Sequence, residues 1–161
     1  MANARPNASP VPGVPGVVDL MPGTRVDWAV LALDLGGTQI HAAVVRCDGT
    51  VVTQRRTRTP VEDGGGAIVQ ACPDAFAACR DAHAVAGGSA VLVGIGIGAP
   101  GPLDPVRGRV IDPPNLGPAF HDAPLAERAR DSLGLPAFLE RDTQVAALGE
   151  GAFGTARGCV D

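Results

Sequence analysis

Apolar residues fall into short runs from Trp28 onward. WAVLALD (28–34) is an almost continuous apolar run that ends in an aspartate, and IHAAVVR (40–46) is a second one. VVTQRRTRT (51–59) alternates and is rich in Val and Thr, as is typical of a strand. Gly-Gly and Asp-Gly pairs separate the runs and favour tight turns. We therefore predict three strands joined by two turns, an antiparallel meander.

The following residues change to helical spacing. Residues 64–88 place apolar side chains near the period of a helix. Pro73 should kink this helix or make it restart, and a Gly-Gly pair should end it. AVLVGIGIG (90–98) is typical of a buried strand. The remaining elements that we predict are a helix over 122–135, a short strand over 136–140 and a helix over 142–154.

The resulting order, β-β-β-α-β-loop-α-β-α, predicts an α/β fold. Three strands in a meander followed by alternating helices and strands favour a mixed sheet with helices packed on it. Residues 1–27 hold five prolines and only short apolar pieces, which is typical of a disordered leader. We expect one folded unit over 28–161.

Composition narrows the classes of function. The chain has 161 residues, of which 45% are hydrophobic and 19% charged, and its net charge is −4. The basic residues are scattered between acidic ones, which disfavours a nucleic-acid-binding surface. No apolar run is long enough to span a bilayer, no membrane-binding face is indicated, and no signal peptide is recognisable. The cytoplasm is the expected location.

Cysteine usage gives no sign of a metal centre or a disulfide framework. The four cysteines form no C-x-x-C pair, and the three histidines do not cluster with them. We therefore expect ordinary thiols and no metal site built from these residues. The cysteines are Cys47, Cys72, Cys79 and Cys159.

The first chemically suggestive stretch is DLGGT (34–38), between the first two strands. Paired glycines permit left-handed backbone and close approach to a ligand, and successive N–H groups in such a turn can bind an anion. Asp34 can hold Mg²⁺ or its waters, and Thr38 can donate its hydroxyl to a phosphate oxygen. A plain hairpin turn explains the same glycines, and both interpretations stay open.

The second stretch, VLVGIGIGAPGP (91–102), contains G-x-G-x-x-G, the pattern of a dinucleotide site. That site needs a helix directly after the glycines. Here Pro100, Pro102 and Pro105 follow instead, so we discard the dinucleotide interpretation. Glycines that allow close approach and prolines that stiffen the walls suit a preorganised pocket. Asn115 can bind a substrate hydroxyl or serve as a turn residue.

The third stretch is ERDTQVAALGEGAFG (140–154), where a strand leads into a helix. An aspartate at this point, Asp142, can accept a proton from a hydroxyl that attacks a phosphoryl group. The helix N-terminus would stabilise its charged form. Asp142 is also a good N-cap, and these residues alone leave the two roles open.

Together the three stretches resemble the ROK family of sugar kinases and repressors. The likeness is carried by LALDLGGTQIHAAVVRCDGTVV, by VLVGIGIGAPGPLDPVRGRVIDPPNLGPAF and by DTQVAALGEGAFGTARG, in that order. The resemblance implies an actin-like, hexokinase-type (ribonuclease H-like) mixed sheet that forms the first lobe of a two-lobe kinase. It also implies ATP and Mg²⁺ as cofactors and glucose or a related hexose as substrate.

The resemblance assigns roles to particular positions. It implies that Asp142 is the catalytic base, and that Asp34, Gly36, Gly37, Thr38 and Gln39 form the phosphate and magnesium loop. The implied sugar-binding residues are Gly98, Ala99, Pro100, Gly101, Asn115 and Arg141. Two positions depart from the family, which often has Lys where this chain has Gln39 and usually has Asn where it has Arg141. The second departure puts the choice of substrate in doubt, since Arg cannot accept hydrogen bonds.

Kinases of this family are about twice as long as this chain. We expect an N-terminal part without the second lobe, its nucleoside pocket and its zinc site. Such a part should have little or no kinase activity alone, and should form a homo-oligomer only if the second lobe is present. A ROK-type sugar-binding regulator is the alternative, although residues 1–27 are too short and proline-rich for a helix-turn-helix. A non-catalytic sugar-binding module is another.

Overall fold

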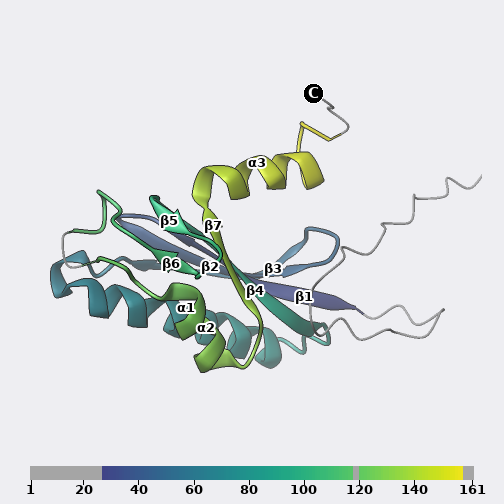
Figure 1. Cartoon of the computed structure of the whole chain (residues 1–161). Coiled ribbons are helices and arrows are strands. Elements are labelled where there is room, and N and C mark those ends of the chain that lie inside the picture. Colours follow the sequence, from purple (N-terminus) through teal and green to yellow (C-terminus); the bar gives the residue numbers. More distant parts are fainter. Residues whose placement is uncertain (1–26, 118–119, 158–161) are drawn as a thin grey trace, which may run out of the picture.

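The computed structural model describes residues 27–117 and 120–157, and a five-stranded sheet lies at its centre (Figure 1). The strand order across the sheet is β3-β2-β1-β4-β7. The strands are β1 (Trp28–Leu35), β2 (Gln39–Arg46), β3 (Val51–Arg58), β4 (Val91–Ala99) and β7 (Ala137–Arg141). A separate two-stranded hairpin is formed by β5 (Leu103–Asp104) and β6 (Arg109–Val110).

Strand direction decides where the sequence motifs meet. β1, β2 and β3 pair antiparallel, which confirms the predicted meander. β4 runs parallel to β1, and β7 runs parallel to β4. The carboxyl ends of β1, β4 and β7 therefore lie at the same edge of the sheet, and each is followed by one of the three suggestive stretches.

Two helices cover one face of the sheet and enclose the core. These are α1 (Gly65–Val85) and α2 (Leu125–Leu133), which Figure 1 shows side by side beneath the strands. Alternate residues of β1 point toward these helices because side chains of a strand alternate between its faces. Phe76 of α1 is fully buried among them. The buried positions of β1 are Ala29, Leu31, Leu33 and Leu35.

Helix α1 runs through Pro73 as one element of 21 residues. The predicted restart is therefore wrong. Pro73 lacks the N–H that would bond to the carbonyl of Val69, but it lies on the buried face of the helix, where packing offsets this loss. The helix ends where the Gly-Gly pair predicts: Val85 is its last residue and Gly87 has a positive φ of 74°.

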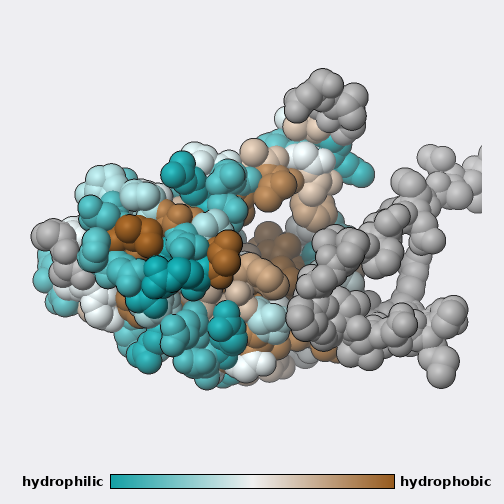
Figure 2. All heavy atoms as spheres, viewed as in Figure 1, coloured by the Kyte–Doolittle hydropathy of each residue, from teal (hydrophilic) through white to brown (hydrophobic). Residues whose placement is uncertain are grey.

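Helix α3 (Asp142–Phe153) lies on the side of the sheet opposite α1 and α2 (Figure 1). None of its residues is buried, and Figure 2 shows it standing clear of the body of the molecule, with apolar residues around the gap. Its contacts are with the ends of β4 and β7, and Phe153 packs on Gly49 in the turn between β2 and β3.

The structure bears on several further expectations. No helix within the described residues has the length and apolar character needed to cross a membrane. Cys47 is exposed, whereas Cys72 and Cys79 are buried, and all three thiols are free. The described ranges bring no three metal-binding side chains together. Cys159 lies outside the described residues, and so does the predicted disordered leader apart from its last residue, Asp27.

Candidate active site

A cavity of about 500 Å³ opens where β1, β4 and α3 meet. Asp34 at the end of β1, Gly98 near the end of β4 and Asp142 at the start of α3 all line it. Asp34 pairs directly with Gly98 across the two parallel strands, which fixes this part of the wall. The remaining lining residues are Leu33, Thr143, Val145 and Ala146. Each suggestive stretch therefore contributes at least one residue to the lining of the same space.

The loop after β1 is a tight turn, in which the Gly36 N–H donates to the carbonyl of Gln39 at 2.9 Å. Neither Gly36 nor Gly37 has a positive φ, so the left-handed backbone that we expected is not the reason for the glycines. The reason at Gly37 is space. A Cβ there would lie 2.8 Å from the carbonyl oxygen of Asn115, closer than real Cβ atoms approach.

Thr59, which the sequence analysis did not single out, holds this loop in place. Its hydroxyl donates to the Gly36 carbonyl at 2.7 Å, and its N–H donates to the Thr38 carbonyl at 2.9 Å. Its side chain is only 3% exposed. The sequence contains one hint of this role, because Thr59 ends the third predicted strand directly before Pro60. No local pattern, however, indicates which loop its hydroxyl contacts.

The loop presents hydrogen-bond donors to solvent. The N–H groups of Gly37 and Thr38 donate to no backbone carbonyl within the described residues. Thr38 and Gln39 are exposed, and the Gln39 side chain lies 3.0 Å from Nε2 of His41. Free successive N–H groups of this kind are what an anion-binding turn requires. Asp34 is also exposed and takes part in no ion pair found among the described residues.

The second suggestive stretch continues beyond Gly98, which lies near the end of β4. No helix follows its glycines, because β5 begins at Leu103 and the next helix is α2; this confirms that the dinucleotide interpretation fails. Ala99 and Pro100 are buried, and the peptide bond between Gly101 and Pro102 is cis. Only Gly98 of this stretch lines the cavity itself.

Asn115 lies in a turn closed by a bond from the Leu116 N–H to the Pro113 carbonyl at 3.4 Å. Its predicted place in a turn is thus confirmed. The same residue is exposed and its backbone rests against Gly37, so this turn is the point where the second stretch contacts the first.

Asp142 is the first residue of α3 rather than its N-cap, a position that Arg141 occupies. The predicted N-cap is therefore shifted by one residue, because β7 continues through Arg141 without a break before the helix begins. Oδ1 of Asp142 accepts a hydrogen bond from the Thr143 N–H at 2.7 Å. The carboxylate is exposed at the cavity, and the positive end of the helix stabilises its charge.

Arg141 lies on the other side of this strand end, against the proline-rich loop. A Cβ on Gly101 would come within 2.9 Å of Nε of Arg141, so the guanidinium rests on the bare backbone of that glycine. The Arg141 N–H donates to Oε1 of Glu140 at 2.8 Å. The residue is exposed.

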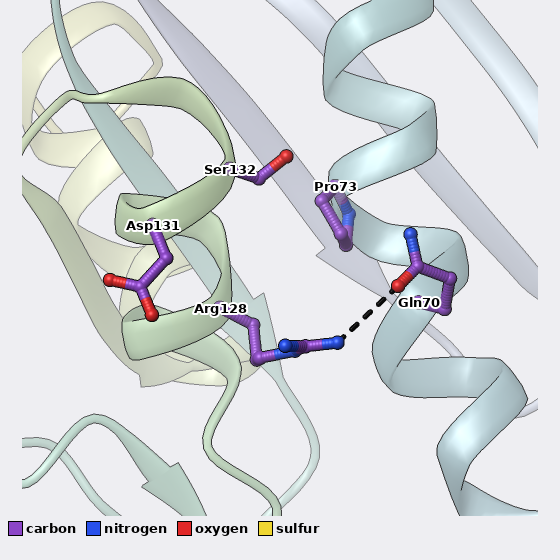
Figure 3. Close-up of a pocket in the computed structure, with 5 residues that line it drawn as sticks. All are labelled: Gln70, Pro73, Arg128, Asp131 and Ser132. Atoms are coloured by element: carbon purple, nitrogen blue, oxygen red, sulfur yellow. Dashed lines mark hydrogen bonds between the residues drawn. The ribbon is translucent and has the colours of Figure 1, made fainter.

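A second hollow, of about 260 Å³, lies between α1 and α2 (Figure 3). Arg128 of α2 reaches across it to Gln70 of α1, with 3.4 Å between the guanidinium Nη2 and the amide oxygen. Pro73, Asp131 and Ser132 complete its lining. None of the residues singled out from the sequence as candidate site residues lies there, and we place the candidate site at the strand ends.

Comparison with known proteins finds a matching family. A model of the ROK family matches residues 30–161. The glucokinase of Streptomyces coelicolor is 34% identical over 128 residues, which cover 80% of this chain and 37% of that enzyme. The chain therefore spans less than two fifths of the length of this relative.

Solved structures confirm the expected actin-like, hexokinase-type fold. The ROK glucokinase of Streptomyces griseus in complex with glucose and AMPPNP superposes with a TM-score of 0.69 at 31% identity, over 81% of this chain and 38% of that one. A ROK family transcriptional regulator gives a TM-score of 0.68 at 20% identity, over 78% of this chain and 31% of that one. At that identity the likeness concerns the fold alone.

Proposed function

This chain belongs to the ROK family, and we propose that it forms the N-terminal lobe of an ATP-dependent kinase that phosphorylates glucose or a related hexose. One observation carries the proposal: Asp34 and Asp142 line a single cavity at the ends of parallel strands. The relatives add support, because the S. coelicolor protein is named a glucokinase and the S. griseus structure holds glucose and AMPPNP.

The turn after β1 is suited to the phosphates of ATP. The free N–H groups of Gly37 and Thr38 can donate to phosphate oxygens, and Thr59 keeps the turn from moving away. Magnesium prefers oxygen ligands and retains several waters. The carboxylate of Asp34, which is exposed and forms no ion pair with the rest of the described chain, fits that preference. ATP with Mg²⁺ supplies the phosphoryl group and neutralises its charge.

Asp142 serves as the general base in this proposal. It accepts the proton of the sugar hydroxyl as that oxygen attacks, which makes the hydroxyl a better nucleophile. Asp142 is exposed at the cavity and bonded at one oxygen to Thr143, so its second oxygen remains for the substrate. Gly98 in the wall of the cavity, and the turn containing Asn115 that packs on Gly37, help to position the sugar in this proposal, since catalysis of this kind depends on placement.

A sugar-binding regulator is the second candidate. It is favoured by Arg141, which stands at a position where the kinases of the family usually have Asn. A non-catalytic sugar-binding module would use the same walls. The aspartate at position 142 favours the kinase, because sugar binding without phosphoryl transfer needs no base there.

Isothermal titration of the 161-residue chain with glucose and with Mg·AMPPNP tests the proposal. We expect Asp34→Asn to weaken binding of Mg·AMPPNP about tenfold or more, because a charge-assisted contact is lost, while glucose binding stays within twofold. Asp142→Asn should weaken glucose and spare the nucleotide. Asp131→Asn, on α2 and away from the cavity, is the matched control and should change neither.

The two candidate functions give different results. A kinase lobe binds sugar and, through the turn after β1, the phosphates of Mg·AMPPNP, whereas a sugar-binding regulator or module binds sugar with no response to the nucleotide. Absence of binding for both ligands, or equal losses in Asp34→Asn and Asp131→Asn, would contradict the proposed site.

A further inference from the structure

The face of the sheet that α1 and α2 leave uncovered carries large apolar side chains that are open to solvent. Trp28 of β1 lies on this face, because the next residue of the strand is buried on the other one. Val91 of β4 is its register partner, and it is exposed as well. Val93 of β4 and Phe138 of β7 are also exposed, the latter by 58%. An apolar area of this kind marks an interaction surface.

A glycine keeps the middle of this face clear. Gly96 lies inside β4, and the strand register places it between Ala32 of β1 and Phe138 of β7. It is exposed, and a Cβ there would meet no atom within 4 Å, so α3 does not fill the space above it. A glycine inside a strand often marks a place where another backbone approaches closely. The space therefore suits an extended chain with compact apolar side chains.

The protein has a segment of this kind next to the face. Residues 11–21 read VPGVPGVVDLM and contain a single charged side chain, Asp19. The prolines at positions 12 and 15 lack an N–H, so they need no strand partner when they lie on a sheet. Asp27 ties the nearby chain to the face, because its carbonyl accepts a hydrogen bond from the Val91 N–H at 2.9 Å. A segment that is too poor in apolar residues to fold alone can still pack on an apolar surface that is already formed.

We propose that residues 11–21, here called the leader segment, pack on this open face against Trp28, Val91 and Phe138. The chain is long enough. Strands lie about 4.8 Å apart and residues rise about 3.3 Å along them, which puts Phe138 about 20 Å from Trp28. Residues 22–27 span about 20 Å when extended, so the leader segment reaches the whole face. The inference goes beyond the proposed function, since it needs neither sugar nor nucleotide.

Trp28 is the single tryptophan of the chain, so its fluorescence reports on this face alone. Acrylamide quenching of the 161-residue chain is compared with that of the double variant Val17→Asp, Val18→Asp. We expect the double variant to be quenched about twofold more steeply, with emission at longer wavelength, because carboxylates are unfavourable against an apolar face. The double variant Asn7→Asp, Ala8→Asp adds the same charge outside the leader segment, and it should behave like the parent chain.

Nuclear Overhauser effects give a second readout at the far side of the face. We expect contacts between valine methyl groups of the leader segment and the ring of Phe138 in the parent chain, and none in the variant Val17→Asp, Val18→Asp. Light scattering should give the mass of a monomer for the parent chain. Circular dichroism of each variant verifies that the fold is intact.

Two results would overturn the inference. If the parent chain and both double variants are quenched equally, and no contact with Phe138 is seen, the leader segment leaves the face open. If Trp28 stays protected in the variant Val17→Asp, Val18→Asp and the mass is that of a dimer, a second copy of the chain covers the face instead. Neither result bears on the proposed kinase site, which the ligand titrations test separately.

Discussion

Gly37 and Asn115 are where two loops of the site pack against each other. Because a Cβ on Gly37 would lie 2.8 Å from the Asn115 carbonyl, the Gly37→Ala substitution must displace one of the two loops. We expect a loss of about 1–3 kcal/mol in the free energy of unfolding. Urea denaturation measures it.

Gly66 provides the matched control for that substitution. It lies in the first turn of α1, and a Cβ there would meet no atom within 4 Å. Gly66→Ala should raise the free energy of unfolding by up to about 1 kcal/mol, since alanine is the better helix former. Equal behaviour of the two alanine variants would show that the loops do not rest on each other.

Thr59 gives a second testable prediction about a single residue. Thr59→Val keeps the shape of the side chain and removes the hydroxyl that donates to Gly36. We expect a loss of about 1–2 kcal/mol in the free energy of unfolding, measured with urea, because the half-buried Gly36 carbonyl loses its partner. Thr57→Val, at an exposed position of β3, should stay within about 0.5 kcal/mol of the parent chain.

Single residues were predictable from the sequence where their role is local. DLGGT signals a turn by its composition alone, and Asn115 follows two prolines as turn residues do. The contact between Gly37 and Asn115 joins residues 78 positions apart, and the bond from Thr59 reaches back 23 positions. No local pattern encodes such pairs, so the sequence analysis missed Thr59. For the same reason it attributed the paired glycines to left-handed backbone, whereas at Gly37 the reason is the lack of room for a Cβ.

At the scale of elements, helix α1 carries two buried thiols that make stability depend on pH. Burial, with a smaller contribution from Asp74, raises the pKa of Cys72 to about 12. Burial also raises the pKa of Cys79. The folded state therefore keeps protons that the unfolded chain releases above its thiol pKa of about 8.5. The stabilisation is complete below that pH and is lost as the pH rises toward 12.

Composition makes this effect unusually easy to isolate. The chain has no Tyr and no Lys, so cysteines are the side chains that titrate between about pH 9 and 12. We expect the free energy of unfolding to fall with a slope of up to about 1.4 kcal/mol per pH unit for each buried thiol. Cys72→Ala should reduce the slope, and Cys47→Ala, at an exposed site, should not. An unchanged slope in Cys72→Ala would contradict the burial of this thiol.

Elements were predicted well where hydrophobic periodicity is strong. The three strands of the meander, α1 and β4 follow from alternation and spacing, with bounds that differ by at most three residues from those of the structure. Pro73 misled the prediction, because its cost is local and visible in sequence while the packing that offsets it is not. Helix α3 was predicted from its spacing, yet its exposure on all sides depends on where the rest of the fold lies.

At the scale of the whole molecule, three stretches that are distant in sequence converge on one edge of the sheet. Their convergence follows from the parallel direction of β1, β4 and β7, which a strand pattern alone does not give. The predicted mixed sheet left the strand order open. The order β3-β2-β1-β4-β7 places β4 between β1 and β7, and thereby puts Gly98 between Asp34 and Asp142.

The most direct test of this convergence is a two-dimensional ¹H–¹⁵N NMR titration of the 161-residue chain with Mg·AMPPNP and with glucose. We expect the nucleotide to shift the backbone signals of Gly36 to Gln39, and glucose to shift those of Gly98, Gly101, Asn115 and Asp142. Gln70 and Ser132, in the hollow between α1 and α2, should stay unchanged. Shifts confined to that hollow, or none at either loop at saturating ligand, would contradict a shared sugar and phosphate site at the strand ends.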